Sequence, residues 1–203
     1  MTMNIAIIGA GLIGRKRAVA LPKNIHLKII CDIDKQAGES FAAEYHCIYE
    51  EDWKKVVSNK DIDVIIIATT NNFLVRIALE AIKNNKHVLL EKPGARNPVE
   101  FKKLLAMKKK HKVVVRIGYN HRYHPAIIEA KKIIDSKKYG KVMFIRARYG
   151  HGARIGYGKE WRFDQKISGG GELLDQGCHL IDLANFYIGE MKTAIGFVGK
   201  MFW

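Results

Sequence analysis

Residues 5–21, "IAIIGAGLIGRKRAVAL", carry Gly9, Gly11 and Gly14 in GxGxxG spacing between an apolar β-branched run and a helix-compatible stretch. In a strand–turn–helix unit, the first glycine permits the tight turn, the second lets the backbone approach a pyrophosphate, and the third packs the helix against the strand. Asp32 ends the next β-branched run, 18 residues after Gly14, where a carboxylate can hydrogen-bond a ribose diol. These features together predict a dinucleotide site, and the alternative is a merely glycine-rich turn.

The charges around this turn bear on which dinucleotide it takes. Asp32 would repel a 2′-phosphate, and only Lys35 lies close downstream to attract one, so the sequence favours NAD over NADP. Arg15, Lys16 and Arg17 stand in the first turns of the expected helix, where the helix dipole disfavours cations. A bound phosphate would offset that cost, and solvated side chains are the alternative.

Short β-branched runs continue along the chain and alternate with helical patterns. Leu74, Ile77, Ala78 and Ala81, for example, recur at helical spacing. Near-continuous apolar strands that alternate with helices predict an α/β fold with a doubly wound parallel sheet covered on both faces. With the glycine turn, this predicts a Rossmann domain over residues 1–120. The runs expected to be strands are residues 4–8, 27–31, 64–68, 87–91 and 113–119.

After the first domain the pattern changes, and we expect residues 121–203 to form a partial α+β substrate domain. A helix is predicted to open at Pro125, followed by a strand at residues 141–150, a glycine-rich and aromatic loop, and a helix within residues 169–182. Residues 193–203, "TAIGFVGKMFW", are typical of a final strand.

Length and composition indicate a globular protein, because 203 residues of which 48% are hydrophobic and 27% charged can bury a core. No run approaches the roughly 20 apolar residues that span a bilayer, so we expect a soluble, cytoplasmic protein with no membrane partner. Cys31, Cys47 and Cys178 are odd in number and lack CxxC spacing, so we interpret them as reduced core residues.

The formal net charge of +15 could indicate nucleic-acid binding. Residues 102–141 alone hold 13 Lys and Arg against two acidic residues, and much of this charge falls on expected helix faces. No aromatic interleaving, zinc-finger spacing or RNP-like motif accompanies it. We therefore predict no nucleic-acid partner and interpret the basic residues as solvated, or as attracting anionic ligands.

Ligands of doubly wound sheets bind beyond the carboxyl ends of the strands, so the segments after the expected strands are candidate cofactor contacts. Thr69, Thr70 and Asn71 could line the cofactor, or could be plain loop and helix-capping residues. Lys92 lies at the mouth of the sheet, although a Lys-Pro pair alone is more often a surface turn. The predicted cofactor-binding residues are Gly9, Gly11, Leu12, Ile13, Gly14, Asp32, Thr69, Thr70, Asn71, Glu91 and Lys92.

Three titratable side chains share one face of the helix expected in "GGGELLDQGCHLID", residues 169–182. Asp175 and His179 lie four residues apart, and Asp182 follows His179 by three. This stripe suits a solvated face, a half-built metal site or a proton-transfer site, and for Asp182 a structural role is favoured over direct chemistry. We expect no metal, although a site could be assembled from His121, His124, His179, Asp175 and Asp182.

Further blocks of the chain read "CDID", "ATTNN", "HVLLEKPGA", "GYNHRYHPA" and, most specifically, "GGGELLDQGCHLIDL". With "IGAGLIG", they resemble the Gfo/Idh/MocA family of nicotinamide-dependent oxidoreductases. The resemblance implies that the EKP lysine and an Asp-x-x-x-His pair meet at the nicotinamide, so Lys92, Asp175 and His179 are the candidate catalytic residues. Histidine suits proton transfer near neutral pH. We expect His179 to be the general base, Asp175 to orient it or the substrate, and Lys92 to polarise the oxygen or relay its proton.

The stretches "EKPGARN", "FIRARYGHGARIGYGKEWR" and "SGGGELLDQG" are similar to a branch of the family associated with sugar and surface-polysaccharide pathways. This implies hydride transfer between the cofactor and a hydroxyl or keto group of a sugar or nucleotide sugar. Aromatic rings stack on sugar faces and arginines bind anionic groups, while loop packing and solvated charge are the alternative. The substrate candidates are Asn120, Arg122, Tyr149, Trp161 and Arg162, with His151, Arg154 and Tyr157 nearby.

Two departures from the family pattern stand out. Shortly after the ATPN-like turn, many members have a histidine where this chain has Leu74. Any cofactor contact that such a histidine makes is therefore not expected here. Family members also continue past the position of Trp203 through a larger open sheet that helps to form the substrate pocket and often the subunit interface. We therefore expect a C-terminally truncated member that is a homo-oligomer in its full-length form. The alternative function is that of a catalytically inactive NAD-binding or regulatory fragment.

Overall fold

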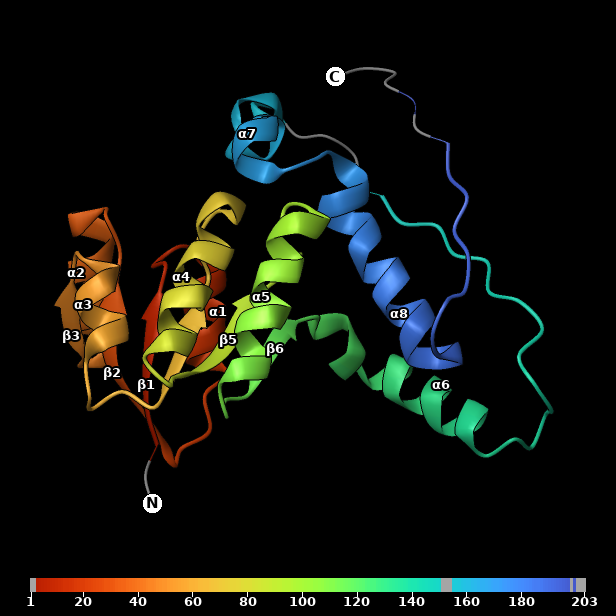
Figure 1. The fold of residues 1–203 in the computed structure, drawn as a ribbon, viewed down its shortest axis with the longest axis horizontal. Helices are drawn as coiled ribbons and strands as arrows, with labels where there is room; N and C mark the ends of the chain where they lie inside the picture. Colours follow the sequence, from red (N-terminus) through yellow and green to blue (C-terminus); the bar gives the residue numbers. More distant parts are fainter. Residues whose placement is uncertain (1–2, 151–154, 198, 200–203) are drawn as a thin grey trace. The chain divides into compact units, whose positions relative to one another are not determined.

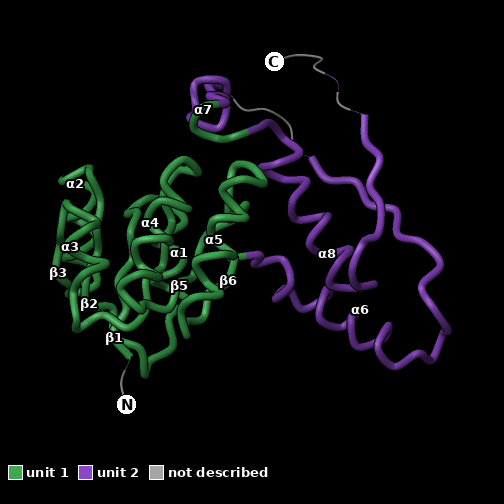
Figure 2. Tube along the Cα trace, viewed as in Figure 1, with its two compact units in different colours: residues 1–118, 166–169 green, residues 119–165, 170–203 purple. Residues whose placement is uncertain are grey.

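The computed structural model describes residues 3–150, 155–197 and 199. The chain forms two compact units, which Figure 2 colours separately. Unit 1 comprises Met1–Gly118 and Lys166–Gly169, and unit 2 comprises Tyr119–Gln165 and Gly170–Trp203. The chain therefore leaves unit 1 after Gly118, returns to it at residues 166–169, and leaves it again.

Unit 1 is built on a six-stranded sheet in which all neighbouring strands are parallel (Figure 1). The strands are β1 (Met3–Ile8), β2 (Ile25–Cys31), β3 (Ile48–Glu50), β4 (Val64–Ile67), β5 (His87–Glu91) and β6 (Val115–Gly118). Their order is β3-β2-β1-β4-β5-β6, so the order reverses between β1 and β4. This confirms the predicted doubly wound α/β sheet, whose ligands bind at the carboxyl ends of the strands beside the reversal.

Five helices connect the strands, and short polar side chains cap three of them. The helices are α1 (Leu12–Val19), α2 (Lys35–Tyr45), α3 (Trp53–Ser58), α4 (Asn71–Lys83) and α5 (Pro98–Lys110). The side chains of Asp34, Asp52 and Asn97 accept hydrogen bonds from backbone N–H groups in the first turns of α2, α3 and α5. These caps satisfy donors that a helix start leaves unpaired, and so fix where each helix begins.

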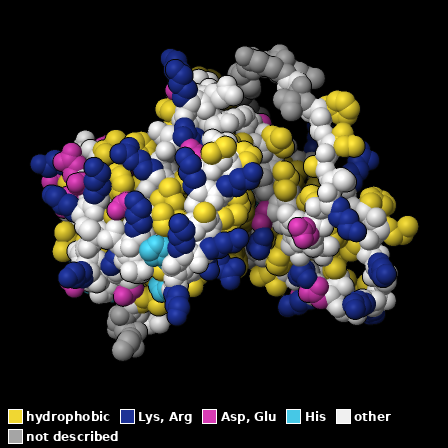
Figure 3. All heavy atoms as spheres, viewed as in Figure 1, with side chains coloured by type: hydrophobic (Ala, Val, Ile, Leu, Met, Phe, Trp, Pro, Cys, Tyr) yellow, Lys and Arg dark blue, Asp and Glu magenta, His cyan; other side chains and the backbone are white. Residues whose placement is uncertain are grey.

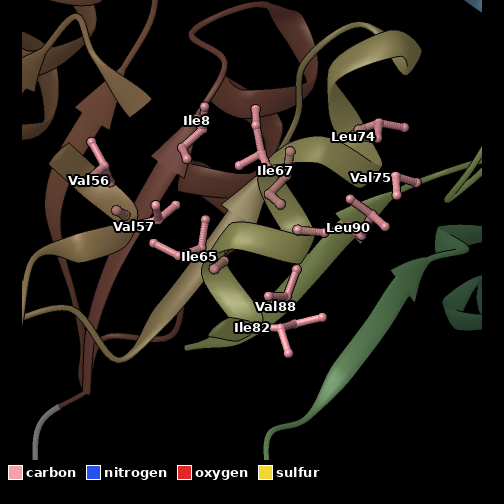
Figure 4. Packing of buried hydrophobic residues seen from close by; sticks show 14 of the residues in the cluster. Ile8, Val56, Val57, Ile65, Ile67, Leu74, Val75, Ile82, Val88 and Leu90 are labelled. Carbon is pink, nitrogen blue, oxygen red and sulfur yellow. The ribbon is translucent and has the colours of Figure 1, made fainter. Parts of the chain in front are cut away.

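Successive residues of β1 point to opposite faces of the sheet and join two separate cores. Ala6 and Ile8 pack in the cluster to which α3, α4 and α5 contribute, part of which Figure 4 shows. Ile5 and Ile7 pack on the other face with α1 and α2, where Phe41 is fully buried. Both faces of the sheet are therefore covered, which explains why its strands are apolar almost throughout.

Unit 2 is helical wherever its described residues have regular structure. Its elements are η1 (Asn120–Tyr123), α6 (Pro125–Asp135), η2 (Tyr157–Lys159), η3 (Trp161–Phe163), η4 (Leu173–Gly177) and α8 (Cys178–Ile188), while α7 (Gln165–Ser168) spans the boundary with unit 1. Helix α6 begins at Pro125 as predicted. The Tyr187 hydroxyl donates to the carbonyl oxygen of Ile127 at 3.3 Å and so joins α8 to α6.

The two strands predicted in the second domain do not form in the part of the chain that the structure describes. Residues 141–150 and the described residues of 193–203 have no regular secondary structure, and Met143 and Phe144 are 93% and 80% exposed. A strand is stable only when its backbone groups pair with a neighbouring strand. A composition rich in β-branched and aromatic residues is therefore not sufficient to form a strand in these two segments.

The visible surface is predominantly basic, because Lys and Arg side chains outnumber the acidic ones on it (Figure 3). Lys108, Lys109 and Lys110 lie in the last turn of α5, where the helix dipole favours cations. Helices long and apolar enough to cross a membrane are not found among the described residues.

Candidate cofactor and catalytic site

The three glycines of the turn after β1 differ in their surroundings in the way that a dinucleotide site requires. Gly9 has a φ of +112°, and a Cβ there would lie 2.5 Å from the Ala68 carbonyl oxygen. A Cβ on Gly14 would lie 1.9 Å from the carbonyl oxygen of Gly9, so this glycine lets α1 pack against the turn. At Gly11, by contrast, a Cβ would meet no described atom within 4 Å. The turn is thus closed at its first and third glycines and open at the second, where a pyrophosphate would approach.

The carboxylate of Asp32 is fixed to the same turn. Its Oδ2 accepts a hydrogen bond from the Ala10 N–H at 2.6 Å, and its Oδ1 accepts one from the Asp34 N–H at 2.9 Å. Both donors are backbone groups, which gives the carboxylate a defined orientation beside the glycines. Each carboxylate oxygen can accept a further hydrogen bond, and a ribose diol offers two donors.

Two of the three basic residues of α1 are paired with carboxylates of the protein. Arg15 forms an ion pair with Glu44. Arg17 Nε lies 2.5 Å from Glu91 Oε1, and its Nη2 is 3.4 Å from the Gly118 carbonyl oxygen. Glu44 thus offsets the cost of Arg15 near the start of α1, whereas Arg17 lies in the last turn of this short helix, where the helix dipole favours a cation. The Glu91 carboxylate, predicted as a cofactor contact, is held by Arg17.

Lys92 follows β5 directly and is half-buried at the carboxyl end of the sheet. The Lys92–Pro93 peptide bond is cis. Gly94 has a φ of +86°, and a Cβ there would lie 2.6 Å from Ile117 Cδ1 of β6. The turn that carries Lys92 is therefore packed tightly against the neighbouring strand.

Thr69, Thr70 and Asn71 follow β4, beside the reversal in strand order. The Thr70 hydroxyl donates to Asn72 Oδ1 at 2.7 Å, and it does not cap the start of α4. Asn71 is buried, and its Nδ2 donates to the Ser168 carbonyl oxygen at 2.9 Å. Asn71 therefore fastens residues 166–169 to unit 1, and its contact with a cofactor stays a prediction.

In unit 2, His179 lies in the first turn of α8 with only 4% of its surface exposed. Its ring stacks on that of His121, with ring centroids 3.9 Å apart and planes 19° apart. Tyr119 meets it edge-on at 6.0 Å, and Tyr149 lies 6.4 Å from it. Burial, together with Cys178 and Asp182, raises the pKa of Tyr119 to about 12, so its phenol keeps its proton at neutral pH. The candidate base thus sits in an aromatic cluster of unit 2.

The segment around Asp175 departs from the single α-helix that the sequence predicts. Leu173–Gly177 form a π-helical turn, and α8 begins only at Cys178. Asp175 lies within the π turn, where its Oδ2 accepts from Gln176 Nε2 at 3.2 Å and lies 3.6 Å from Arg162 Nε. A π turn is wider than an α turn, so the spacing rule that aligned Asp175 with His179 does not hold across it.

Asp182, one turn after His179, pairs with Arg122. Arg122 Nε donates to Asp182 Oδ2 at 2.8 Å, and Arg122 Nη2 donates to Asp182 Oδ1. Asp182 is only 6% exposed, so this fork offsets the cost of burying its charge. The geometry favours the structural reading of Asp182, with its partner in the same unit. The same pair engages two donors of the Arg122 guanidinium group, and the contact of Arg122 with a substrate stays a prediction.

The other substrate candidates lie on η1, on residues 141–150 and around η3. Asn120 is exposed at the start of η1, and the ring of Tyr149 lies 5.7 Å from that of His121. Arg162 lies over the ring of Trp161 at 4.7 Å and donates to Glu160 at 3.0 Å. His151 and Arg154 lie outside the described residues. The structure thus brings Tyr149 to the histidines and Arg162 to Asp175.

Neither a metal centre nor a disulfide is seen in the described ranges. No group of three or more His, Cys, Asp and Glu side chains there could hold a metal ion. Cys31, Cys47 and Cys178 are free thiols. Burial raises the pKa of the Cys31 thiol to about 12, which fits a reduced core residue.

Sequence reasoning considered His121 only as a possible metal ligand and gave Tyr119 no role. Both belong to the stretch "GYNHRYH", which begins at the carboxyl end of β6. Their position after a strand of a doubly wound sheet was the available signal. Their contact with His179 could not be read from spacing, because it joins residues nearly sixty positions apart.

A parallel sheet with an open glycine turn and a carboxylate fixed beside it defines a dinucleotide-binding protein. The chain belongs to the Gfo/Idh/MocA oxidoreductase family: the model of its NAD-binding Rossmann fold matches residues 3–119, and that of its C-terminal domain matches residues 127–202. The Rossmann model thus covers the six strands of unit 1 and the five helices that connect them.

Among curated relatives, levoglucosan dehydrogenase of Pseudarthrobacter phenanthrenivorans is 30% identical over 206 residues, which cover 94% of this chain and 52% of that protein. Inositol 2-dehydrogenase of Salmonella typhimurium is 26% identical over 196 residues, which cover 94% of this chain and 56% of that protein. The chain thus spans about half the length of these relatives.

Two solved structures illustrate the likeness in fold. A levoglucosan dehydrogenase in complex with NADH and levoglucosan superposes with a TM-score of 0.84 at 27% identity, over 94% of this chain and 55% of the other. The myo-inositol 2-dehydrogenase from Lactobacillus plantarum gives 0.83 at 26% identity, over 93% of this chain and 57% of the other.

Proposed function

We propose that this chain is the cofactor-binding and catalytic part of a dehydrogenase that transfers hydride between NAD and a hydroxyl or keto group of a sugar or nucleotide sugar. The observation that carries the proposal is the likeness to a levoglucosan dehydrogenase complex with NADH and levoglucosan, which runs over 94% of the chain. Inositol 2-dehydrogenase supports the same class of substrate, a ring that carries hydroxyl groups.

The preference for NAD over NADP rests on Asp32. Its carboxylate is held beside the glycine turn by the N–H groups of Ala10 and Asp34. A ribose diol can donate to such a carboxylate, whereas a 2′-phosphate would meet a like charge that cannot turn away. Gly9, Gly11, Leu12, Ile13 and Gly14 would hold the pyrophosphate, while Thr69, Thr70 and Lys92 would line the rest of the cofactor.

The bound nicotinamide supplies a hydride acceptor at its C4 atom. Oxidation of a hydroxyl also releases the proton of its oxygen, which a base within hydrogen-bond reach must take. His179 is that base in our proposal, since imidazole accepts a proton near neutral pH. Asp175 orients His179 or the substrate, and Lys92 places a cation near the oxygen on which negative charge develops. Substrate, cofactor and base together yield the keto sugar, NADH and one proton.

The test begins with binding. Titrations of the chain with NADH and NADPH can be followed by cofactor fluorescence. The dissociation constant for NADH should be at least about 10-fold lower than that for NADPH, a difference of about 1.4 kcal/mol in binding free energy. Asp32→Ala should bring the dissociation constants of NADH and NADPH closer together. Asp34→Asn removes a neighbouring negative charge, but asparagine can still cap α2, so this variant should keep the preference of the wild type. Equal affinity of the wild type for both cofactors would contradict the assigned role of Asp32.

The second part of the test is turnover on levoglucosan, myo-inositol and a set of nucleotide sugars with NAD. His179→Ala and Lys92→Ala should each lower kcat about 10²- to 10⁴-fold with little change in NADH affinity. Near-normal turnover by either variant would refute its catalytic role. NADH binding without turnover of any sugar would instead support the alternative of an NAD-binding regulatory protein.

A further inference from the structure

Two consecutive residues of η1 hold helix α8 at two points one turn apart. Arg122 forms the bidentate pair with Asp182, and its guanidinium lies 5.4 Å from the centroid of the Phe186 ring. The preceding residue, His121, stacks on His179. Residues 179 and 182 lie on one side of α8, so neighbouring side chains of the short turn reach both.

The stacked ring of His121 restricts how His179 can move. Its centroid is 3.9 Å from that of His179 and the two planes are 19° apart, which is close to van der Waals contact over one face. Tyr119 stands edge-on to the same imidazole at 6.0 Å. Rotation of the His179 ring about its last side-chain bond would drive it into these neighbours. His121 and Tyr119 therefore restrict the plane of the His179 imidazole.

We propose that His121 is a positioning residue that fixes the imidazole plane of His179, and that the Arg122–Asp182 pair anchors η1 so that the stack persists. The inference rests on the proposed function in one respect, that His179 is the base of the dehydrogenase. A base must be held close to its productive orientation, and a displacement of about 1 Å can cost on the order of 10²-fold in rate. Contact between His121 and the reacting atoms is not required.

The alternative is that the stack only contributes packing energy. The two interpretations can be compared by replacing His121 with a residue that has a planar ring but does not titrate. His121→Phe keeps a ring on His179, whereas His121→Ala removes it. His124 provides a matched control, because it is a histidine of the same segment that is exposed and accepts a hydrogen bond from the Ala126 N–H at the start of α6. His124→Asn retains an N-cap side chain there.

The first readout is turnover. We expect His121→Ala to lower kcat about 10- to 100-fold with KM changed less than about 3-fold. His121→Phe should restore kcat to within a few-fold of the wild type, and His124→Asn should leave it unchanged. If His121→Ala kept its kcat, or if His121→Phe lost as much activity as His121→Ala while remaining folded, the positioning role would be wrong.

The second readout does not need activity. In the chain labelled with isotopes at histidine, the ring protons of His179 should resonate upfield because of the ring current of its stacked neighbour, and should do so in the His121→Phe variant as well. In His121→Ala the signal should move toward the value of a free imidazole. Should the wild type turn over no sugar, the proposed function fails, but this spectrum still tests the stack on which the inference rests. An unchanged His179 signal in His121→Ala would overturn it.

Discussion

Gly11 differs from Gly9 and Gly14 in what an added methyl group would meet. Its backbone angles, φ −69° and ψ −173°, are open to any residue, and no described atom lies within 4 Å of a Cβ there. At Gly14 the added carbon would collide with the backbone of the turn. The fold thus requires two of the three glycines, whereas the proposed role of Gly11 is to leave room for the ligand.

We therefore expect Gly11→Ala to unfold at the same urea concentration as the wild type but to bind NADH at least about 10-fold more weakly, because the methyl group occupies the approach of the pyrophosphate. Gly14→Ala should lose about 1–3 kcal/mol of stability from overpacking. Urea denaturation and NADH titration on both variants measure this. The assignment fails if Gly11→Ala binds NADH normally.

Tyr119 gives a pH dependence whose sign follows from its environment. Its pKa is about 12 in the folded protein against 10.0 without the fold, chiefly because burial disfavours the phenolate. The folded state therefore holds this proton more tightly than the unfolded state. Its contribution to stability is complete below pH 10 and is lost as pH rises from 10 to 12.

Comparison of the wild type with Tyr119→Phe isolates this effect, since phenylalanine keeps the ring and has no proton to lose. From pH 9 to pH 12 the wild type should lose about 2 kcal/mol more free energy of unfolding than the variant. Urea titrations at a series of pH values measure the difference. Parallel curves for the two proteins would show that Tyr119 is not buried in solution.

At the scale of elements, a buried lysine joins the loop before β4 to the turn before β5. Lys86 is buried, and its Nζ donates to the carbonyl oxygens of Asn59 at 2.6 Å and Ile62 at 2.7 Å. Burial lowers the pKa of Lys86, which the nearby acids Asp61 and Asp63 partly oppose. The Asn59 carbonyl oxygen also accepts a hydrogen bond from the Ile62 N–H at 3.3 Å, so the ammonium group matters most for the carbonyl group of Ile62.

Lys86→Met removes the donor but keeps the length of the apolar stem, and should destabilise unit 1 by about 1–3 kcal/mol because the Ile62 carbonyl group loses its hydrogen bond to the ammonium group. Lys83→Met is the matched control: Lys83 is exposed and pairs with Glu80 one turn earlier on α4, so its loss should cost less than about 0.5 kcal/mol. Equal midpoints of chemical denaturation for the two variants would rule out the bridging role of Lys86.

The secondary-structure elements also differ in how well sequence patterns predict them. The sheet and helices of unit 1 were predictable because their apolar periodicity and capping residues are local signals. The π turn at Leu173–Gly177 was not, since Gly177 lowers the helix propensity of the segment without distinguishing a π turn from an α turn. The strand expected at residues 141–150 failed because a strand depends on a partner that composition does not reveal.

At the scale of the whole molecule, the sequence indicates the candidate site residues by their type but does not indicate their partners. The glycines, Asp32, Lys92 and His179 stand out by motif or resemblance. The pairings of Arg17 with Glu91 and of Arg122 with Asp182 join residues 74 and 60 positions apart. Such pairs depend on the way the chain folds back, which spacing along the sequence cannot encode.

The return of residues 166–169 to unit 1 has a consequence for how the polypeptide could be divided. Arg96 Nη1 donates to the Lys166 carbonyl oxygen at 2.5 Å, Asn71 holds that of Ser168, and Gly169 packs against Arg96. A nick in the exposed turn at Lys137 would yield two polypeptides, and the later one would still contribute to the Rossmann domain of the earlier one. Residues 166–169 would then join the two polypeptides together with the Tyr187–Ile127 and Arg122–Asp182 hydrogen bonds, so we expect separately expressed halves to reassociate in a fragment-complementation experiment.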